Sequence, residues 1–289
     1  MLIDFELLAI VTGINAIAAL GFYFTLSSGQ FSMAHGALYA VGGYIGAFSA
    51  TTLALPFPLA IILGFVGSSL VGALVALLLQ RVRGLYFAVA TLAFGVVAME
   101  AVKRIPGLGG PFGLGGIPNF TSLPVVLIVL LIVVLAVWQF DRSPLYVSHA
   151  AARVDQDGAV VMGVNVVVTR GIAFAIGGGI AGIAGVLYGG MTTIMPPEAG
   201  GFATSLAILL MVVIGGAHTW RGAVLGAIIW TVTPELLRAT VEWRMVLFGV
   251  AAVVLMIWRP QGIIPRRIFS SRARERLRGL FSRRQEAVA

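Results

Sequence analysis

The sequence contains no cysteine and few charged residues, and each of these features excludes some classes of protein. Without cysteine there is no disulfide framework, no thiol nucleophile and no cysteine-based metal site. Only 10% of the 289 residues are charged, whereas 59% are hydrophobic. A soluble core of this size cannot use so much apolar surface. A membrane protein can, because each spanning helix needs roughly 20 mostly apolar residues.

Residues that perform catalysis are also scarce. The only histidines are His35, His149 and His218, and none has metal-binding spacing such as HExxH. A Gly-x-Ser-x-Gly elbow and a Walker A lysine motif are both missing, so we expect no ATP, metal or other cofactor to bind this chain itself. Glu100 and Glu235 are the only acids inside the predicted spans, and both lie toward span ends, which argues against a proton-driven carrier.

Long apolar runs predict an all-α, polytopic membrane protein with about 8–10 transmembrane helices. No basic residue precedes the first run, so we interpret it as a mature span and not as a cleaved signal peptide. The predicted spans are 7–26, 36–54, 57–79, 85–102, 122–140, 171–192, 203–217, 223–240 and 244–258.

Basic residues between these spans indicate the cytoplasmic side. If the N-terminus is outside, one side receives Arg81, Arg83, Arg142, Arg153, Arg170, Arg221 and the arginine-rich tail. The minority on the other side is Lys103, Arg104 and Arg244. A re-entrant segment in place of a span would change the parity, and with it the side on which the N-terminus lies.

Two glycine-rich stretches look like broken or re-entrant helices. Residues 29–37 and 215–223 both read glycine, six residues, then Gly-Ala, and both carry a histidine. This pattern is typical of transporters built from two related halves, although coincidence in a glycine-rich chain gives the same pattern. The loop 105–118 is too rich in glycine and proline to be helical, and on this topology it faces outward.

One polar block, from Asp141 to Arg170, interrupts the apolar runs on the basic side. Pro144 can open a helix, residues 150–157 predict one or two polar-faced helical turns, and Gly163 can reverse the chain. A short helix lying across the membrane surface can transmit force from a soluble partner. The alternative is that the block is only an amphipathic connector.

The net charge of +8 lies largely in the C-terminal tail and does not indicate nucleic-acid binding. Directly after a final span, such a basic run is typical of a cytoplasmic segment attracted to anionic lipid. A specific contact with a partner protein is the alternative. We therefore divide the chain into a transmembrane permease domain, 1–264, and a basic cytoplasmic tail, 265–289.

Five segments together resemble the LivM-type permease of branched-chain amino acid ABC importers. They are Gly84–Gly95, Gly109–Leu114, Gly163–Asn165, Thr233–Arg238 and Arg259–Gly262. The resemblance runs in order from about residue 12 to 264. It implies a permease subunit of the bacterial cytoplasmic (inner) membrane, with a cytoplasmic C-terminus, that works by alternating access.

The resemblance also implies partners. They would be a LivH-like permease, two cytoplasmic ABC ATPases that bind the ATP and Mg²⁺, and a periplasmic solute-binding protein. The block 141–168 would then be the cytoplasmic coupling segment, in which the usual Glu-Ala-Ala character is diluted. The residues expected to couple to the ATPases are Ala151, Ala152, Arg153, Asp155, Gly163 and Asn165.

The substrate pathway is expected at the first glycine-rich stretch, where free backbone groups can handle a zwitterion. Its expected residues are Gly29, Gln30, Ser32 and Gly36, with Thr91 and Phe94 from the segment 84–95. Relatives handle several cargoes, so urea, short amides or other small polar solutes are alternative substrates. A self-contained secondary carrier or channel is a further alternative. A membrane enzyme would need a cluster of acid, base or metal ligands, and the sequence shows none.

Overall fold

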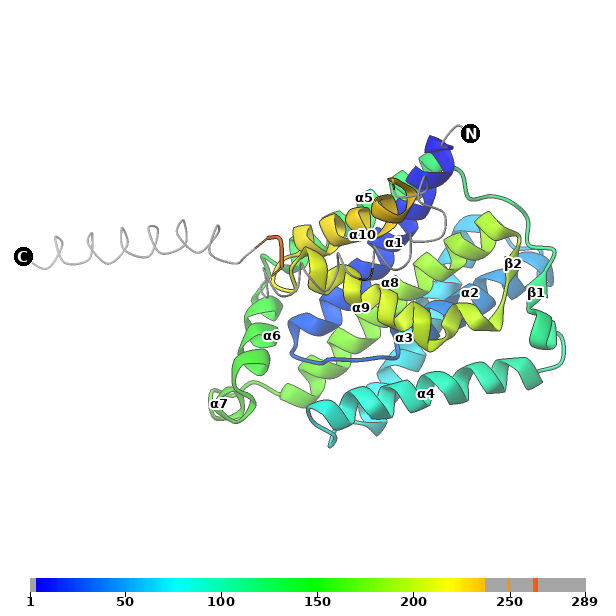
Figure 1. Ribbon diagram of the computed structural model, residues 1–289. Helices are drawn as coiled ribbons and strands as arrows, with labels where there is room; N and C mark the ends of the chain where they lie inside the picture. Colours follow the sequence, from blue (N-terminus) through cyan, green and yellow to red (C-terminus); the bar gives the residue numbers. More distant parts are fainter. Residues whose placement is uncertain (1–3, 237–248, 250–261, 265–289) are drawn as a thin grey trace, which may run out of the picture.

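Helices make up most of the chain that the computed structural model describes, which is residues 4–236, 249 and 262–264 (Figure 1). The helices are α1 Phe5–Ser27, α2 His35–Thr51, α3 Phe57–Leu78, α4 Leu85–Arg104, α5 Leu123–Phe140, α6 Pro144–Val154, α7 Gln156–Val161, α8 Val166–Thr192, α9 Phe202–Gly215 and α10 Trp220–Leu236. Two 3₁₀ turns, η1 Gly110–Phe112 and η2 Pro197–Gly200, and two short strands, β1 Leu114–Gly115 and β2 Ile194–Met195, complete the described part. The all-α prediction is confirmed.

Five of the described helices, α1, α3, α4, α5 and α8, are long and apolar enough to span a membrane. They coincide with five of the nine predicted spans. The predicted spans 203–217 and 223–240 correspond to α9 and α10, which are bent by 117° and together count as at most one further span. The predicted span 36–54 corresponds to α2, which has 17 residues, fewer than the roughly 20 that a span needs. The predicted span 244–258 lies outside the described residues, apart from Gly249.

Helix α8 lies at the centre of the bundle and packs against α1, α2 and α3. Small residues make these contacts possible. Gly177 packs against the backbone of Gly21, Gly182 against Gly42, and Gly185 against Tyr39. Helices pack this closely in membranes only where side chains are minimal, because lipid supplies no hydrophobic force to draw larger surfaces together.

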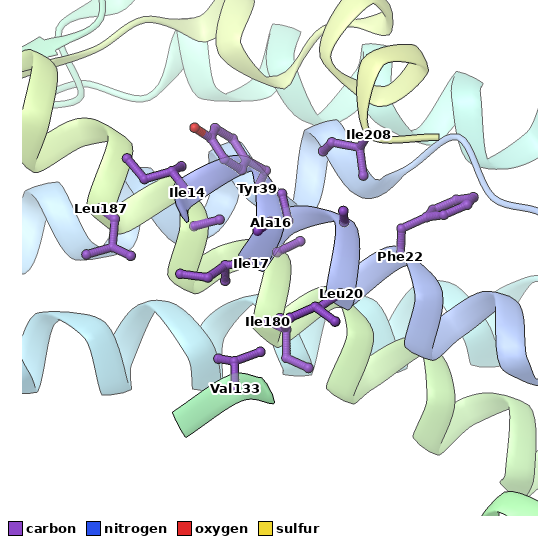
Figure 2. Packing of buried hydrophobic residues seen from close by; sticks show 14 of the residues in the cluster. Ile14, Ala16, Ile17, Leu20, Phe22, Tyr39, Val133, Ile180, Leu187 and Ile208 are labelled. Atoms are coloured by element: carbon purple, nitrogen blue, oxygen red, sulfur yellow. The ribbon is translucent and has the colours of Figure 1, made fainter. Parts of the chain in front are cut away.

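Helix α1 supplies the core that faces these neighbours. Figure 2 shows Ile14, Ile17 and Leu20 of α1 close to Ile180 and Leu187 of α8. Two thirds of the apolar window of α1 and of α8 is buried, against 28% for α3 and 17% for α5. The inner pair therefore forms the core, while α3 and α5 present most of their apolar side chains outward, as lipid-facing helices do.

The two ends of the bundle differ. At one end lie α6 and α7, and at the other lies the pair of strands (Figure 1). Strand β1 pairs antiparallel with β2, with Leu114 opposite Met195. The loop 105–118 is free of α-helix, as predicted, but it is not a simple turn, because it contains η1 and this pairing to the end of α8.

Candidate functional site

Both glycine-rich stretches are breaks between helices, as predicted. The first break, residues 28–34, separates α1 from α2. Gly29 has a φ of +82°, a conformation that glycine adopts without strain. Gln30 is buried and accepts a weak hydrogen bond from Ser28, and Ser32 accepts one from the amide of Ala34. The loop therefore satisfies part of its exposed backbone locally.

The remaining predicted pathway residues lie beside this break. The Thr91 hydroxyl of α4 accepts a hydrogen bond from the amide of Met33 at 2.9 Å, and Phe94 packs against the same region. Gly36, in the first turn of α2, donates its amide proton to the Ser205 hydroxyl of α9 at 3.0 Å. The predicted pathway residues thus surround the first break, and Gly36 ties it to α9.

The second break, residues 216–219, separates α9 from α10. Gly216 has a φ of +121°, and Gly215 packs against the backbone of Gly222 and Gly226. These close contacts let α10 turn back along α9 at the 117° bend. The correspondence of the two breaks as an internal repeat stays a prediction.

The polar block folds as two short helices, where the sequence predicted one or two turns. Pro144 occupies the first turn of α6, as predicted, but α6 ends at Val154 because Asp155 leaves the helix. The Asp155 carboxylate instead caps α7, accepting hydrogen bonds at 3.1 Å from the amides of Asp157 and Gly158. Gly163 has a φ of +82°, and the side chain of Asn165 caps α8 by accepting from Val168. The predicted chain reversal at Gly163 is confirmed.

Helix α6 is anchored to the end of α1 by His149. This histidine is buried, and its Nδ1 lies 3.0 Å from the Ser27 hydroxyl. Its ring packs edge-on against Phe24 and Phe140. Burial lowers the pKa of His149 to about 4, so the ring is neutral at neutral pH. Ala152, one turn further along α6, is also fully buried, so α6 is packed against the bundle.

Asp141, just before α6, is a second anchor. Its carboxylate accepts a hydrogen bond from the Tyr23 hydroxyl at 3.1 Å. Burial raises the pKa of Asp141 to about 6, and the bond from Tyr23 opposes that rise. The sequence analysis missed Asp141 and His149 as site residues. The sequence shows that both residues are polar. It does not show their partners, because Tyr23 lies 118 residues before Asp141 and Ser27 lies 122 residues before His149.

Arg153 connects α6 to both breaks. Its guanidinium donates to the backbone oxygen of Ala217 at 3.3 Å and lies 3.1 Å from Nδ1 of His218. Its backbone lies against Gly29, where an added Cβ would come within 2.9 Å of the Arg153 Cα. One residue of the polar block therefore contacts the two places at which the membrane helices are interrupted.

A cavity of about 690 Å³ opens between the first break and the polar block. Gly29 and Gln30 line it from the break, and Gly163 and Asn165 line it from the polar block. The structure thus brings members of the two predicted residue sets to one cavity. Ala151 is half-buried on α6, and its carbonyl oxygen accepts from the amide of Asp155.

Two of the basic residues that the sequence assigned to one side of the membrane lie at this cavity. Arg83 and Arg170 both line it, and Arg83 forms an ion pair with Asp157 at 3.7 Å. Arg142 stacks over Trp138 at the end of α5. The arginine-rich tail, 265–289, lies outside the described residues. Within the part that the structure describes, no group of three or more histidine, aspartate or glutamate side chains is arranged to hold a metal ion.

The sequence matches a known protein family. The model of the family described as "Branched-chain amino acid transport system / permease component" matches residues 5–258. The high-affinity branched-chain amino acid transport system permease protein LivM of Salmonella typhimurium is 30% identical over 89% of this chain and 69% of its own length. LivH of the same organism is 24% identical over 82% of this chain and 86% of its own length. BraD of Pseudomonas aeruginosa is 26% identical over 82% of this chain and 87% of its own length. No solved structure matches this chain.

Proposed function

The chain belongs to the family of permease components of branched-chain amino acid transport systems, and from this premise we propose its specific task. It is the membrane-spanning permease subunit of an ATP-driven importer in a bacterial cytoplasmic membrane. The cargo is a branched-chain or related hydrophobic amino acid. The names of the LivM, LivH and BraD relatives support this cargo, because all three are described as branched-chain amino acid permeases.

The importer has further subunits under this proposal. A second, LivH-like permease completes the membrane part, two cytoplasmic ATPases bind ATP and Mg²⁺, and a periplasmic binding protein delivers the amino acid. The basic residues near α6 and α7 support a cytoplasmic position for that end of the bundle. The C-terminal tail, 265–289, extends on the same side and binds anionic lipid.

Segment 141–168 is the coupling segment of this machine. The observation that carries the assignment is Arg153, which contacts Gly29 at the first break and both Ala217 and His218 at the second. A displacement of α6 by an ATPase therefore acts on both breaks at once. Because breaks are the points at which helices can pivot without losing regular hydrogen bonds, this contact turns ATPase closure into alternating access.

The experiment is reconstitution of the complete complex in proteoliposomes, with radiolabelled leucine and ATP on the ATPase side. We expect uptake only with the binding protein, with ATP and with active ATPase subunits. Uptake by the two permeases alone would show a self-contained carrier instead. Uptake of urea or a short amide, without uptake of leucine, valine or isoleucine, would contradict the proposed cargo.

The coupling assignment has its own test in Arg153→Ala. We expect this variant to assemble and hydrolyse ATP while leucine uptake per ATP falls about tenfold, since charge-assisted hydrogen bonds to the second break are lost. Arg142→Ala is the matched control, because Arg142 lies at the same end but stacks on Trp138. Equal leucine uptake per ATP hydrolysed in the two variants would show that Arg153 does not couple α6 to the breaks.

A further inference from the structure

A second cavity, of about 380 Å³, lies between helices of the bundle, away from the polar block. Its walls come from α1, α2, the end of α8, η2, α9 and α10. None of the described residues that line it belongs to α6 or α7. The volume falls within the range of roughly 300–1,000 Å³ that is typical of small-molecule pockets.

Most of this cavity is apolar. Its aliphatic and thioether wall consists of Ile14, Ala18, Met191, Ala207, Ile208 and Met211. Among the residues that the structure describes, no charged side chain lines it. A wall of this kind suits a branched aliphatic side chain better than it suits a urea-like solute, which needs hydrogen bonds on every side.

One edge of the cavity is polar, and it is made by the first turn of α9. Ala203 and Thr204 line the cavity there. The N-cap of α9 is Gly201, which has no side chain to cap the helix. The first amides of a helix have no partner within it, and the helix dipole makes this end attractive to a carboxylate. Discontinuous helices in transporters use their N-termini in this way.

Tyr39 gives an independent indication of a polar ligand. Its side chain is 6% exposed and lines the cavity, but its hydroxyl has no hydrogen-bond partner among the described residues. Figure 2 shows its ring beside Ile14, with the hydroxyl oxygen pointing away from α1. A hydroxyl that reaches a cavity without a protein partner can donate a hydrogen bond to a ligand oxygen there, and a bond to a charged oxygen adds affinity.

The cavity is also connected to the coupling machinery through α9. One end of this helix, at Thr204, lines the cavity, and the other end, at Gly215, leads into the second break beside Arg153. The first break is joined to the same helix through the bond from Gly36 to Ser205. A rigid displacement of α9 therefore changes the cavity and both breaks together.

We propose that this cavity holds the transported amino acid, with its carboxylate at the first turn of α9 and the Tyr39 hydroxyl and its aliphatic side chain against the apolar wall. The proposal rests on the function proposed above and names its substrate site. The Asn15 amide, which also lines the cavity and donates to Thr231 at 2.9 Å, retains a carbonyl oxygen that can accept from the substrate ammonium.

The test uses the reconstituted full complex with radiolabelled leucine and valine. Tyr39→Phe removes only the hydroxyl, and we expect the KM for leucine to rise about tenfold while ATP hydrolysis without substrate is unchanged, since a hydrogen bond to a charged group is lost. Tyr44→Phe is the matched control. Tyr44 lies on the same helix, and its buried hydroxyl has no partner among the described residues, but it does not line the cavity. Equal KM values in both variants would overturn the proposal.

A second variant tests the apolar wall without touching the polar edge. Ala207→Leu narrows the cavity, and we expect leucine uptake to fall about tenfold more than valine uptake, because valine is one methylene smaller. Equal losses for both would place the site elsewhere. Photo-leucine, a diazirine analogue, should label peptides from α1 or α9 in wild-type complex and be displaced by leucine. A wild-type complex that transports no branched-chain amino acid would instead refute the proposed function, and the substrate named here with it.

Discussion

Gly36 marks the tightest contact between the first break and α9, and replacing it by alanine tests whether that contact is essential. A Cβ on Gly36 would lie 2.5 Å from the Ser205 hydroxyl oxygen, 2.8 Å from the Ser205 amide nitrogen and 2.9 Å from the Gly201 carbonyl oxygen. Two of these three atoms belong to the backbone of α9 and of its N-cap residue, Gly201. The neighbour therefore cannot yield by rotating a side chain, and the two helices must separate.

The magnitude of the stability change follows from three effects, of which two are destabilising and one is stabilising. Overpacking of this kind costs about 1–3 kcal/mol. Separation also lengthens the 3.0 Å bond from the Gly36 amide to Ser205, which is worth about 1 kcal/mol. In the opposite direction, alanine is favoured over glycine within a helix by about 1 kcal/mol. The net expectation for Gly36→Ala is a loss of about 1–3 kcal/mol, and Gly36→Leu should abolish transport or assembly.

Gly95 and Gly171 provide the comparison. A Cβ on Gly95 would lie 3.6 Å from Ala37, an ordinary contact, and a Cβ on Gly171 would meet nothing within 4 Å. Both are helical, so alanine there should leave stability unchanged or raise it by up to about 1 kcal/mol. Thermal denaturation of the purified complex in detergent and leucine uptake in proteoliposomes measure the difference. If Gly36→Ala matches Gly95→Ala in both assays, the close packing on α9 has no role.

The other predictions concern the polar block and the topology. Gly163→Val places a β-branched residue at a φ of +82°, so it should insert normally but lower leucine uptake per ATP hydrolysed; unchanged coupling would make the block a connector. Because burial holds the pKa of His149 near 4 against an ordinary 6.5, its docking against Ser27 is complete above pH 6.5 and weakens as the pH falls towards 4. Thermal stability should therefore fall on acidification more steeply in the wild type than in His149→Gln, and parallel curves would contradict this. On the cysteine-free background, Val154→Cys should react with an impermeant thiol reagent only after permeabilisation, and Phe112→Cys should react from outside; the reverse pattern would invert the topology.

Local features of this fold could be predicted from the sequence because local chemistry decides them. Hydropathy alone located α1, α3, α4, α5 and α8, since a helix must satisfy its own backbone inside lipid. Pro144 at the start of α6 and Gly163 at the reversal follow from restrictions on φ that act within a few residues. The first break was visible for the same reason.

Long-range contacts of the site could not be predicted. The bend between α9 and α10 depends on Gly215 fitting against Gly222, and composition alone does not distinguish that arrangement from two spans. The resemblance predicts that Arg153 couples to the ATPases, but nothing in the sequence indicates that it also contacts the two breaks. Its contacts with Gly29 and Ala217 arise only when segments from three parts of the chain meet. The place of Tyr39 at the second cavity could not be predicted either, because the sequence alone does not distinguish it from an aromatic residue of the core.

The central position of α8 sets an order for biosynthesis. Helices α1, α2 and α3 leave the ribosome first, but the helix against which all three pack begins only at Val166. The glycine-lined contacts at Gly21 and Gly42 therefore have no counterpart while the first half of the chain is inserting. Because a domain generally folds as a unit, the packing of α1, α2 and α3 remains incomplete until more than half of this chain has been made. A chain truncated before Val166 should consequently be recognised and degraded by membrane quality control, whereas truncation after α8 should leave a protease-resistant core.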